Sequence, residues 1–145
     1  MTTREELYRA ISEAITGIEE IKHIDLWNHN VEFIEQETAW ERPAVFIEFQ
    51  PIQWNPVVHS VEYRAEVGIN LHVVTDWNEG NGIGEFRLLE KIHEVLADMD
   101  GETFADLDLA SSVTNHNHEE IVENIERYTC VGFRTIRNQE RGIRN

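Results

Sequence analysis

The segment SSVTNHNHEEI, residues 111–121, gathers side chains that could bind a metal ion. His116 and His118 are two residues apart and are followed directly by Glu119 and Glu120. Residues two apart in an extended chain project from the same face, so both imidazoles could reach one zinc ion and a glutamate could complete the site. A metal-dependent hydrolase that uses His116, His118 and Glu119 is therefore one functional hypothesis.

The sequence on either side of this segment favours a different interpretation. The stretches TFADLDLASSVT and IVENIERYTCVGFRTI both carry strand patterns, which predict two antiparallel strands joined across NHNHEE. Asn tolerates the left-handed backbone angles of such turns, and the more specific zinc motifs place their ligands on a rigid element. We therefore predict a polar hairpin turn, with no metal and no cofactor, and keep the zinc site as the alternative.

Two further features bear on catalysis. The loop GNGIG, residues 80–84, lies between a predicted strand and a predicted helix, as phosphate-binding loops do. Its glycine spacing departs from the dinucleotide fingerprint, no Lys-Ser/Thr pair follows, and acidic residues flank it, so we interpret it as a connector. Cys130, the only cysteine, lies in the apolar stretch ERYTCVGF and is predicted to be a buried core thiol. No catalytic residue is predicted, and the protein is expected not to be an enzyme.

Composition limits the classes of partner. The chain has 145 residues, which predicts a single domain over 1–145. Asp and Glu number 28 against 12 Lys and Arg, giving a formal net charge of −16. Such a surface repels phosphate backbones and anionic lipids, so proteins are the expected partners. The N-terminus lacks a signal-peptide pattern and no apolar run approaches the ~20 residues of a membrane span, so we expect a soluble product of the cytoplasm.

The predicted elements are, in chain order, a helix, a strand, a long strand or hairpin, a helix and two strands. A capping box of Thr3 and Glu6 opens a first helix that is expected to run to about Gly17. Residues 21–43 read as a connector with one short strand, and residues 44–50 as a strand with Val45, Ile47 and Phe49 on one face. A second helix is predicted over 85–101, where Gly101 supplies the stop.

Residues 57–75, VVHSVEYRAEVGINLHVVT, alternate between apolar and polar positions throughout. An unbroken strand of this length would span roughly 60 Å, more than the width of such a domain. Either the strand bends at Gly68, or part of it projects as a hairpin arm with residues 45–51 or with another subunit. The fold class we predict is α+β: a mixed, mainly antiparallel sheet with two helices packed on one face and a long projecting β-hairpin.

The four tryptophans lie in or beside the predicted connectors. Aromatic residues at such places either close the ends of a core or contact another protein. Together with the long alternating stretch, they favour a protein that assembles. The predicted oligomer-interface residues are Trp54, Val57, Tyr63 and Trp77.

The layout resembles that of the tail terminator, or tail-completion, proteins of the necks of long-tailed bacteriophages and prophages. The stretches that carry the resemblance are RPAVFIEF, VEYRAEVGINLHVVTD and LDLASSVTNHNHEEIVENIERYTCVGFRT. The resemblance implies a structural virion protein, assembled in the cytoplasm of a bacterial host. It would form a ring, commonly a hexamer, that caps the tail tube and joins it to the head connector.

The same resemblance implies that DNA passes through the ring lumen without specific binding, which agrees with the acidic composition. It also implies that the projecting hairpin builds the contacts between neighbours. The alternatives are another head-tail joining component, the metal-dependent hydrolase named above, and a small acidic binding module.

Overall fold

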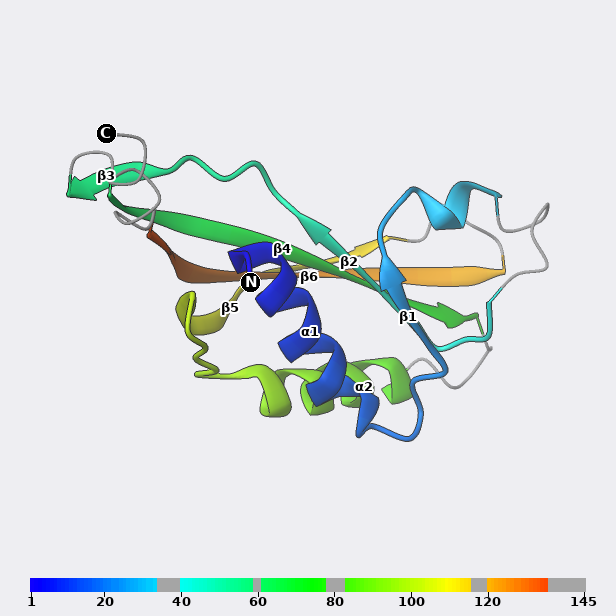
Figure 1. Ribbon diagram of the computed structural model, residues 1–145. Helices are drawn as coiled ribbons and strands as arrows, with labels where there is room; N and C mark the ends of the chain where they lie inside the picture. Colours follow the sequence, from blue (N-terminus) through cyan, green and yellow to red (C-terminus); the bar gives the residue numbers. More distant parts are fainter. Residues whose placement is uncertain (34–39, 59–60, 78–82, 116–119, 136–145) are drawn as a thin grey trace.

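The structure, a computed structural model, describes residues 1–33, 40–58, 61–77, 83–115 and 120–135 (Figure 1). Two α-helices and six strands make up the regular structure of these residues, together with a 3-10 helix at Asn30–Phe33. In chain order they are α1 (Thr3–Thr16), β1 (His23–Leu26), β2 (Ala44–Phe49), β3 (Asn55–Val58), β4 (Glu62–Asp76), α2 (Ile83–Leu96), β5 (Phe104–Asn115) and β6 (Ile121–Thr135).

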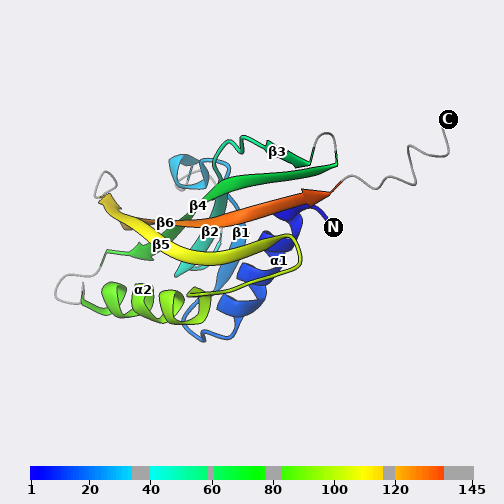
Figure 2. The same cartoon turned by 90° about the vertical axis from the view of Figure 1, so that its left-hand side faces the viewer.

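All six strands form one mixed sheet. The strand order is β1-β2-β4-β6-β5, and β3 pairs with β4 outside this path. β1 runs parallel to β2, whereas every other pairing is antiparallel. Both helices lie on the same side of the sheet (Figures 1 and 2). The predicted α+β class, with a mainly antiparallel sheet and two helices on one face, is confirmed.

Each helix buries one apolar stripe against the sheet. Leu7, Ile11 and Ile15 recur at four-residue steps in α1 and are fully buried. They share the main core with buried residues of α2, which are Leu88, Ile92 and Leu96. The core also contains the odd-numbered positions Val67, Ile69, Leu71 and Val73 of β4. Among the described residues, no helix is long and apolar enough to cross a membrane.

The helix ends differ from the prediction by a few residues. The N-cap of α1 is Thr2, whose hydroxyl accepts the Glu5 N–H at 3.2 Å, and not Thr3. Thr3 instead lies within the helix and its hydroxyl donates to the Phe133 carbonyl at 3.2 Å. α2 ends at Leu96, before Gly101, and Asp98 takes a left-handed φ of 60° just beyond it.

The opposite face of the sheet carries a smaller cluster of buried residues. Val31, Ala44, Phe46, Val74 and Ile121 are buried there, with Trp27 and Trp40 packed against them. Successive side chains of a strand point to opposite faces of the sheet, so Phe46 and Val74 face away from the main-core residues next to them in their strands. The first two of the four tryptophans therefore close this second cluster.

The long alternating stretch contains a turn, which the pattern alone did not reveal. Residues 55–58 form β3 and fold back on the start of β4, with Asn55 opposite Arg64 and Val58 opposite Glu62. In its projecting part β4 therefore pairs with β3 on one side and with β6 on the other. The alternative in which residues 45–51 pair with the 57–75 stretch is found, but in the body of the sheet and not in the projecting part. β2 pairs instead with the other half of β4, where Ala44 lies opposite Val74.

The predicted C-terminal strand pair is confirmed. β5 and β6 run antiparallel, with Asn115 opposite Glu123, so the strands on both sides of the NHNHEE segment are hydrogen-bonded to each other. Ile121, Ile125, Val131 and Phe133 of β6 share one face of the sheet, the face away from the helices. The main core takes Tyr128 and Cys130 from β6 instead.

Glu6 ties α1 to the segment before β5, and its removal gives a pH-dependent prediction. Its carboxylate accepts the Thr103 hydroxyl at 2.6 Å and the N–H groups of Thr103 and Glu102 at 2.7 and 3.0 Å. Burial by itself raises the pKa of Glu6, but these hydrogen bonds outweigh it and lower the pKa below 4.5. A lowered folded-state pKa stabilises the fold above the unfolded value, and this stability is lost as the pH falls through the folded value.

We expect Glu6→Gln to lower the free energy of unfolding by about 1 kcal/mol at neutral pH. The difference from the parent protein should shrink in acid, as the pH falls below the ordinary value of 4.5. Urea denaturation at a series of pH values measures this. Glu13→Gln, an exposed change on the same helix, should leave the curve unchanged. A Glu6→Gln effect that stays constant down to low pH would contradict the assignment.

Candidate functional site

The sheet extends past the helices at one end as a three-stranded arm (Figures 1 and 2). We define the arm as β3, residues 61–66, which include the start of β4, and residues 131–135 at the end of β6. Tyr63 lies opposite both Pro56 and Arg134, so β4 is its middle strand. Val57 and Val58 of β3 are 56% and 48% exposed. Large apolar side chains in solvent at the end of a projecting sheet are typical of a surface that contacts another protein.

The four predicted interface residues do not all lie in one place. Val57 and Tyr63 belong to the arm. Trp54 precedes β3 and packs beside Gly132, where an added Cβ would lie 3.2 Å from its ring. Trp77 follows the opposite end of β4 and is 51% exposed. Its backbone N–H donates to the Glu120 carbonyl at 2.9 Å. The structure therefore brings three of them to the arm and separates Trp77 from it.

The alternative zinc ligands His116, His118 and Glu119 lie outside the described residues. The strands that flank them are paired, as described above. Within the described ranges, no group of three or more His, Cys, Asp or Glu side chains could hold a metal ion. Residues 80–82 of the glycine-containing loop are also outside the described ranges, whereas Gly84 lies in the first turn of α2.

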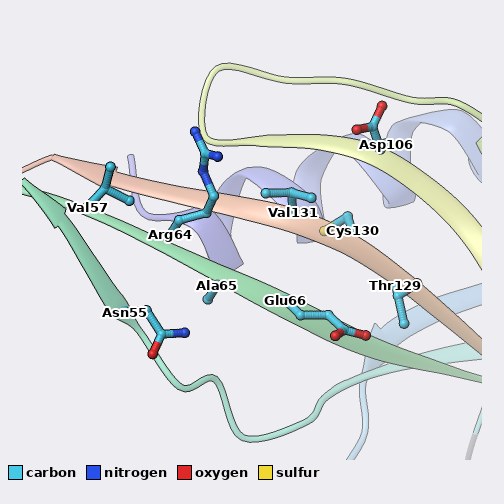
Figure 3. Close-up of a pocket in the computed structure, with 9 residues that line it drawn as sticks. All are labelled: Asn55, Val57, Arg64, Ala65, Glu66, Asp106, Thr129, Cys130 and Val131. Atoms are coloured by element: carbon cyan, nitrogen blue, oxygen red, sulfur yellow. The ribbon is translucent and has the colours of Figure 1, made fainter.

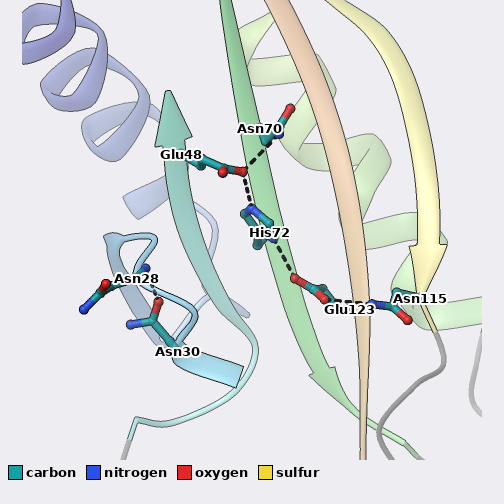
Figure 4. A network of polar contacts seen from close by, with 7 residues as sticks. All are labelled: Asn28, Asn30, Glu48, Asn70, His72, Asn115 and Glu123. Carbon is teal, nitrogen blue, oxygen red and sulfur yellow. Dashed lines mark hydrogen bonds and ion pairs between the residues drawn. The ribbon is translucent and has the colours of Figure 1, made fainter. Parts of the chain in front are cut away.

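A network of polar side chains crosses the sheet on the face opposite the helices (Figure 4). His72 of β4 lies between two carboxylates: its Nε2 is 2.8 Å from Glu48 Oε1 and its Nδ1 is 2.6 Å from Glu123 Oε2. Asn70 donates to Glu48 at 3.0 Å, and Asn115 donates to Glu123 at 3.1 Å. Four neighbouring strands, β2, β4, β6 and β5, are thus connected by side chains as well as by their backbones.

The charge balance of this network follows from its hydrogen bonds. A neutral imidazole has one N–H, so two contacts to carboxylates require one additional proton, on the ring or on a carboxyl group. Burial by itself raises the pKa of Glu48, but hydrogen bonds from His72 and Asn70, and the charge of His72, lower it overall. Glu123 and His72 are each only 4% exposed, so both lose most of their hydration on folding. The contact between them is the main interaction that offsets this desolvation cost.

Trp27 covers the network from outside. Its ring stacks on that of His72 with centroids 3.7 Å apart and an angle of 2° between the planes. The backbone N–H of Trp27 donates to the Ile47 carbonyl at 2.9 Å, and the backbone N–H of Asn28 donates to the Asn30 side chain at 2.7 Å. Both nitrogens of His72 are occupied and its ring is covered, so the network connects the strands to one another and to Trp27.

Sequence reasoning did not identify this network. In the sequence, His72 is one of several scattered histidines and occupies one of the even-numbered, mostly polar positions of its strand. Its partners Glu48 and Glu123 are 24 and 51 residues away in the sequence, and nothing distinguishes them from the other carboxylates. The one usable signal is the polar parity of β4, which predicts that His72 and Asn70 share a face.

A shallow hollow of about 550 Å³ lies along the arm, and its lining comes from β3, β4, β5 and β6 (Figure 3). Arg64, Glu66 and Thr129 are among the polar residues that line it, and Cys130 is also part of the lining. Burial raises the pKa of the Cys130 thiol to about 12, so the thiol remains protonated and unreactive at neutral pH. The buried core thiol predicted from the sequence is confirmed.

Comparisons with solved structures show a likeness in fold. No protein-family model matches this chain, and no curated protein matches it. A chain from the solved structure of the virion of a native gene transfer agent (GTA) particle aligns with a TM-score of 0.58 and 8% sequence identity. The alignment covers 92% of this chain and 96% of that chain. This protein therefore shares, over almost its whole length, the fold of a chain from a gene transfer agent virion.

Proposed function

We propose that this protein is a structural virion subunit of a phage or phage-like particle, and that it forms a ring at the head-proximal end of the tail. The observation that carries the proposal is the end-to-end likeness to a chain of the GTA virion. Because both chains are covered almost completely, the likeness concerns the whole fold and not a motif common to many proteins. Fold alone does not determine function, so the proposed function also depends on the surface of this chain.

The arm and the charge support the finer assignment as a tail terminator. The arm presents Val57 and Val58 to solvent, and the burial of such side chains stabilises contacts between subunits. With a net charge of −16, a ring of these subunits would repel the phosphates of DNA passing through its lumen. The partners in this assignment are further copies of the chain, in a hexamer, with the tail tube on one side and the head connector on the other.

The arm gives the experimental test of this function. The full-length protein should form a closed ring of a single order, seen by native mass spectrometry and negative-stain microscopy. Val57→Asp with Val58→Asp should shift the protein to monomers, since charged residues would have to be buried at the subunit contact. Both positions are exposed in the single chain, so its melting temperature should change little.

The matched control is Val95→Asp, the same substitution at an exposed site on α2 (41% exposed), which should leave the ring intact. A double arm variant that assembles like the parent would remove the arm from the subunit contact. A parent protein that stays monomeric, and that fails to bind the ends of purified tail tubes, would contradict the function itself. Binding to head connectors but not to tail tubes would favour another head-tail joining component.

A further inference from the structure

The outer edge of β5 is open over its second half. Residues 98–101 cover the first half, where the Asp98 N–H donates to the Leu107 carbonyl at 2.9 Å and the Leu107 N–H donates to the Met99 carbonyl at 3.2 Å. From residue 109 to 115, β5 has β6 as its only strand neighbour within the described part of the chain. This stretch, LASSVTN, has no charged residue and no proline, although 28% of the chain is charged. Charged residues and prolines are two of the features by which natural sheets protect an edge from pairing, and both are missing here; one register shift interrupts the pairing with β6, between Leu109 and Ser111.

A groove runs beside this open edge, between β5 and α2. Its volume is about 280 Å³, and Phe86 and Leu89 of α2 line it together with Ser112 of β5. The lining also contains two carboxylates, Glu90 and Glu126, and no Lys or Arg. Glu126 is 6% exposed, and its Oε2 atom is buried with no hydrogen-bond partner among the described residues. A strand added to the β5 edge would direct alternate side chains toward this groove, which favours a basic side chain.

The chain contains one short segment with that chemistry. Residues 136–145, IRNQERGIRN, hold three of the 12 basic residues and only one of the 28 acidic ones. The segment therefore carries a net charge of +2 in a protein of net charge −16. Its arginines, Arg137, Arg141 and Arg144, are the side chains best suited to pair with carboxylates.

The same segment is too short to reach the open edge of its own subunit. It begins after Thr135, at the arm, whereas Ser112 lies opposite Glu126, nine residues back along β6. That distance is about 30 Å along the strand. Ten residues span at most about 35 Å when fully extended. A turn and the covered first half of β5 must also be passed, so the segment cannot pair along the length of 109–115 in its own subunit.

We propose that residues 136–145 of one copy of this protein add as a strand to the open β5 edge of a neighbouring copy, and direct an arginine into the groove toward Glu90 and Glu126. This inference rests on the proposed function, because it requires copies of the chain to meet in an assembly. It adds a second contact, distinct from the apolar side chains of the arm, in which charge complementarity joins each subunit to the next. Main-chain hydrogen bonds would supply affinity and the groove would select the basic segment.

Disulfide trapping in the full-length protein tests the proposal. A cysteine at Ser112 is combined with a cysteine at Arg137, Arg141 or Arg144 in turn, since the native thiol is buried and unreactive. One chain that carries Ser112→Cys and a matching tail cysteine should give a ladder of covalent multimers on oxidation. Two singly substituted chains should give a covalent dimer only when they are mixed. Val95→Cys in place of Ser112→Cys, an exposed site on α2, is the control that should not cross-link.

The charge contribution is tested by reversing the three arginines. Arg137→Glu with Arg141→Glu and Arg144→Glu should weaken association by about tenfold or more, the factor that corresponds to about 1.4 kcal/mol. An intramolecular disulfide in the doubly substituted chain would overturn the proposal. Rings that form but never cross-link at Ser112 would also overturn it while leaving the proposed function intact. A protein that forms no oligomer under any condition would overturn both.

Discussion

Replacing His72 with alanine is expected to lower the free energy of unfolding by about 3–5 kcal/mol, the usual cost of removing one partner from a buried charged pair. His72 Nδ1 is 2.6 Å from Glu123, and both side chains are almost fully buried. Without the imidazole, the Glu123 carboxylate would lose its main compensating partner, and Glu48 would lose the hydrogen bond that helps to lower its pKa. The indole of Trp27 would also lose the ring on which it stacks. Urea denaturation followed by circular dichroism measures the loss.

A typical domain has a free energy of unfolding of about 5–15 kcal/mol. A loss of this size is therefore expected to leave the variant partly unfolded at growth temperature. The control is His93→Ala, which removes a histidine of intermediate exposure whose Nδ1 is 3.5 Å from the Tyr128 hydroxyl and should cost much less. Combining His72→Ala with Glu123→Gln should recover part of the loss, because no uncompensated buried charge would remain. A His72→Ala variant as stable as His93→Ala would show that the network does not hold the sheet together.

Gly101→Ala is expected to cost about 1–3 kcal/mol, because the added methyl group has no space. A Cβ at this position would lie 2.5 Å from Phe104 Cε1 and 2.8 Å from the Glu6 carboxyl carbon. Phe104 is fully buried, and the Glu6 carboxylate is held by its hydrogen bonds to Glu102 and Thr103. Neither neighbour can move without losing packing or hydrogen bonds. The change in denaturation midpoint at constant slope measures the effect.

The chain provides a matched control for this substitution at Gly17. A Cβ there would have its nearest neighbour at 3.6 Å, an ordinary contact, and the backbone φ of −69° suits alanine. Gly17→Ala should therefore leave stability unchanged or raise it slightly, because alanine restricts the unfolded chain. Equal effects of the two substitutions would mean that crowding by Phe104 and Glu6 does not govern residue 101.

Local periodicity was sufficient to predict most of the elements and their buried faces. The four-residue steps of Leu7, Ile11 and Ile15 identify the buried stripe of α1, and the alternation from Val67 to Val73 identifies the core face of β4. Periodicity could not reveal the β3–β4 turn, because the residues around it continue the same apolar and polar alternation. It also could not identify the N-cap, since Thr2 and Thr3 are chemically equivalent candidates and tertiary contacts decide between them.

The residues of the candidate site divide in the same way. Val57 and Tyr63 were predicted from their position in an overlong strand, and the structure places both in the projecting arm. The His72 network and the groove beside β5 depend on pairs such as His72 with Glu123 and Ser112 with Glu126, which only strand pairing across the sheet brings together. A single sequence contains no local signal for such contacts.

The bond between Thr3 at the start of α1 and Phe133 near the end of β6, 130 residues apart, has a consequence for biosynthesis. β4, the central strand, pairs along its whole length with β6, so most of the sheet cannot form while the last strand is still inside the ribosome. The nascent chain must therefore hold α1, β2 and β4 without this partner until residues 121–135 have been made and have left the ribosome. Because long-range pairing slows folding, we expect this protein to fold more slowly than a helical protein of the same length.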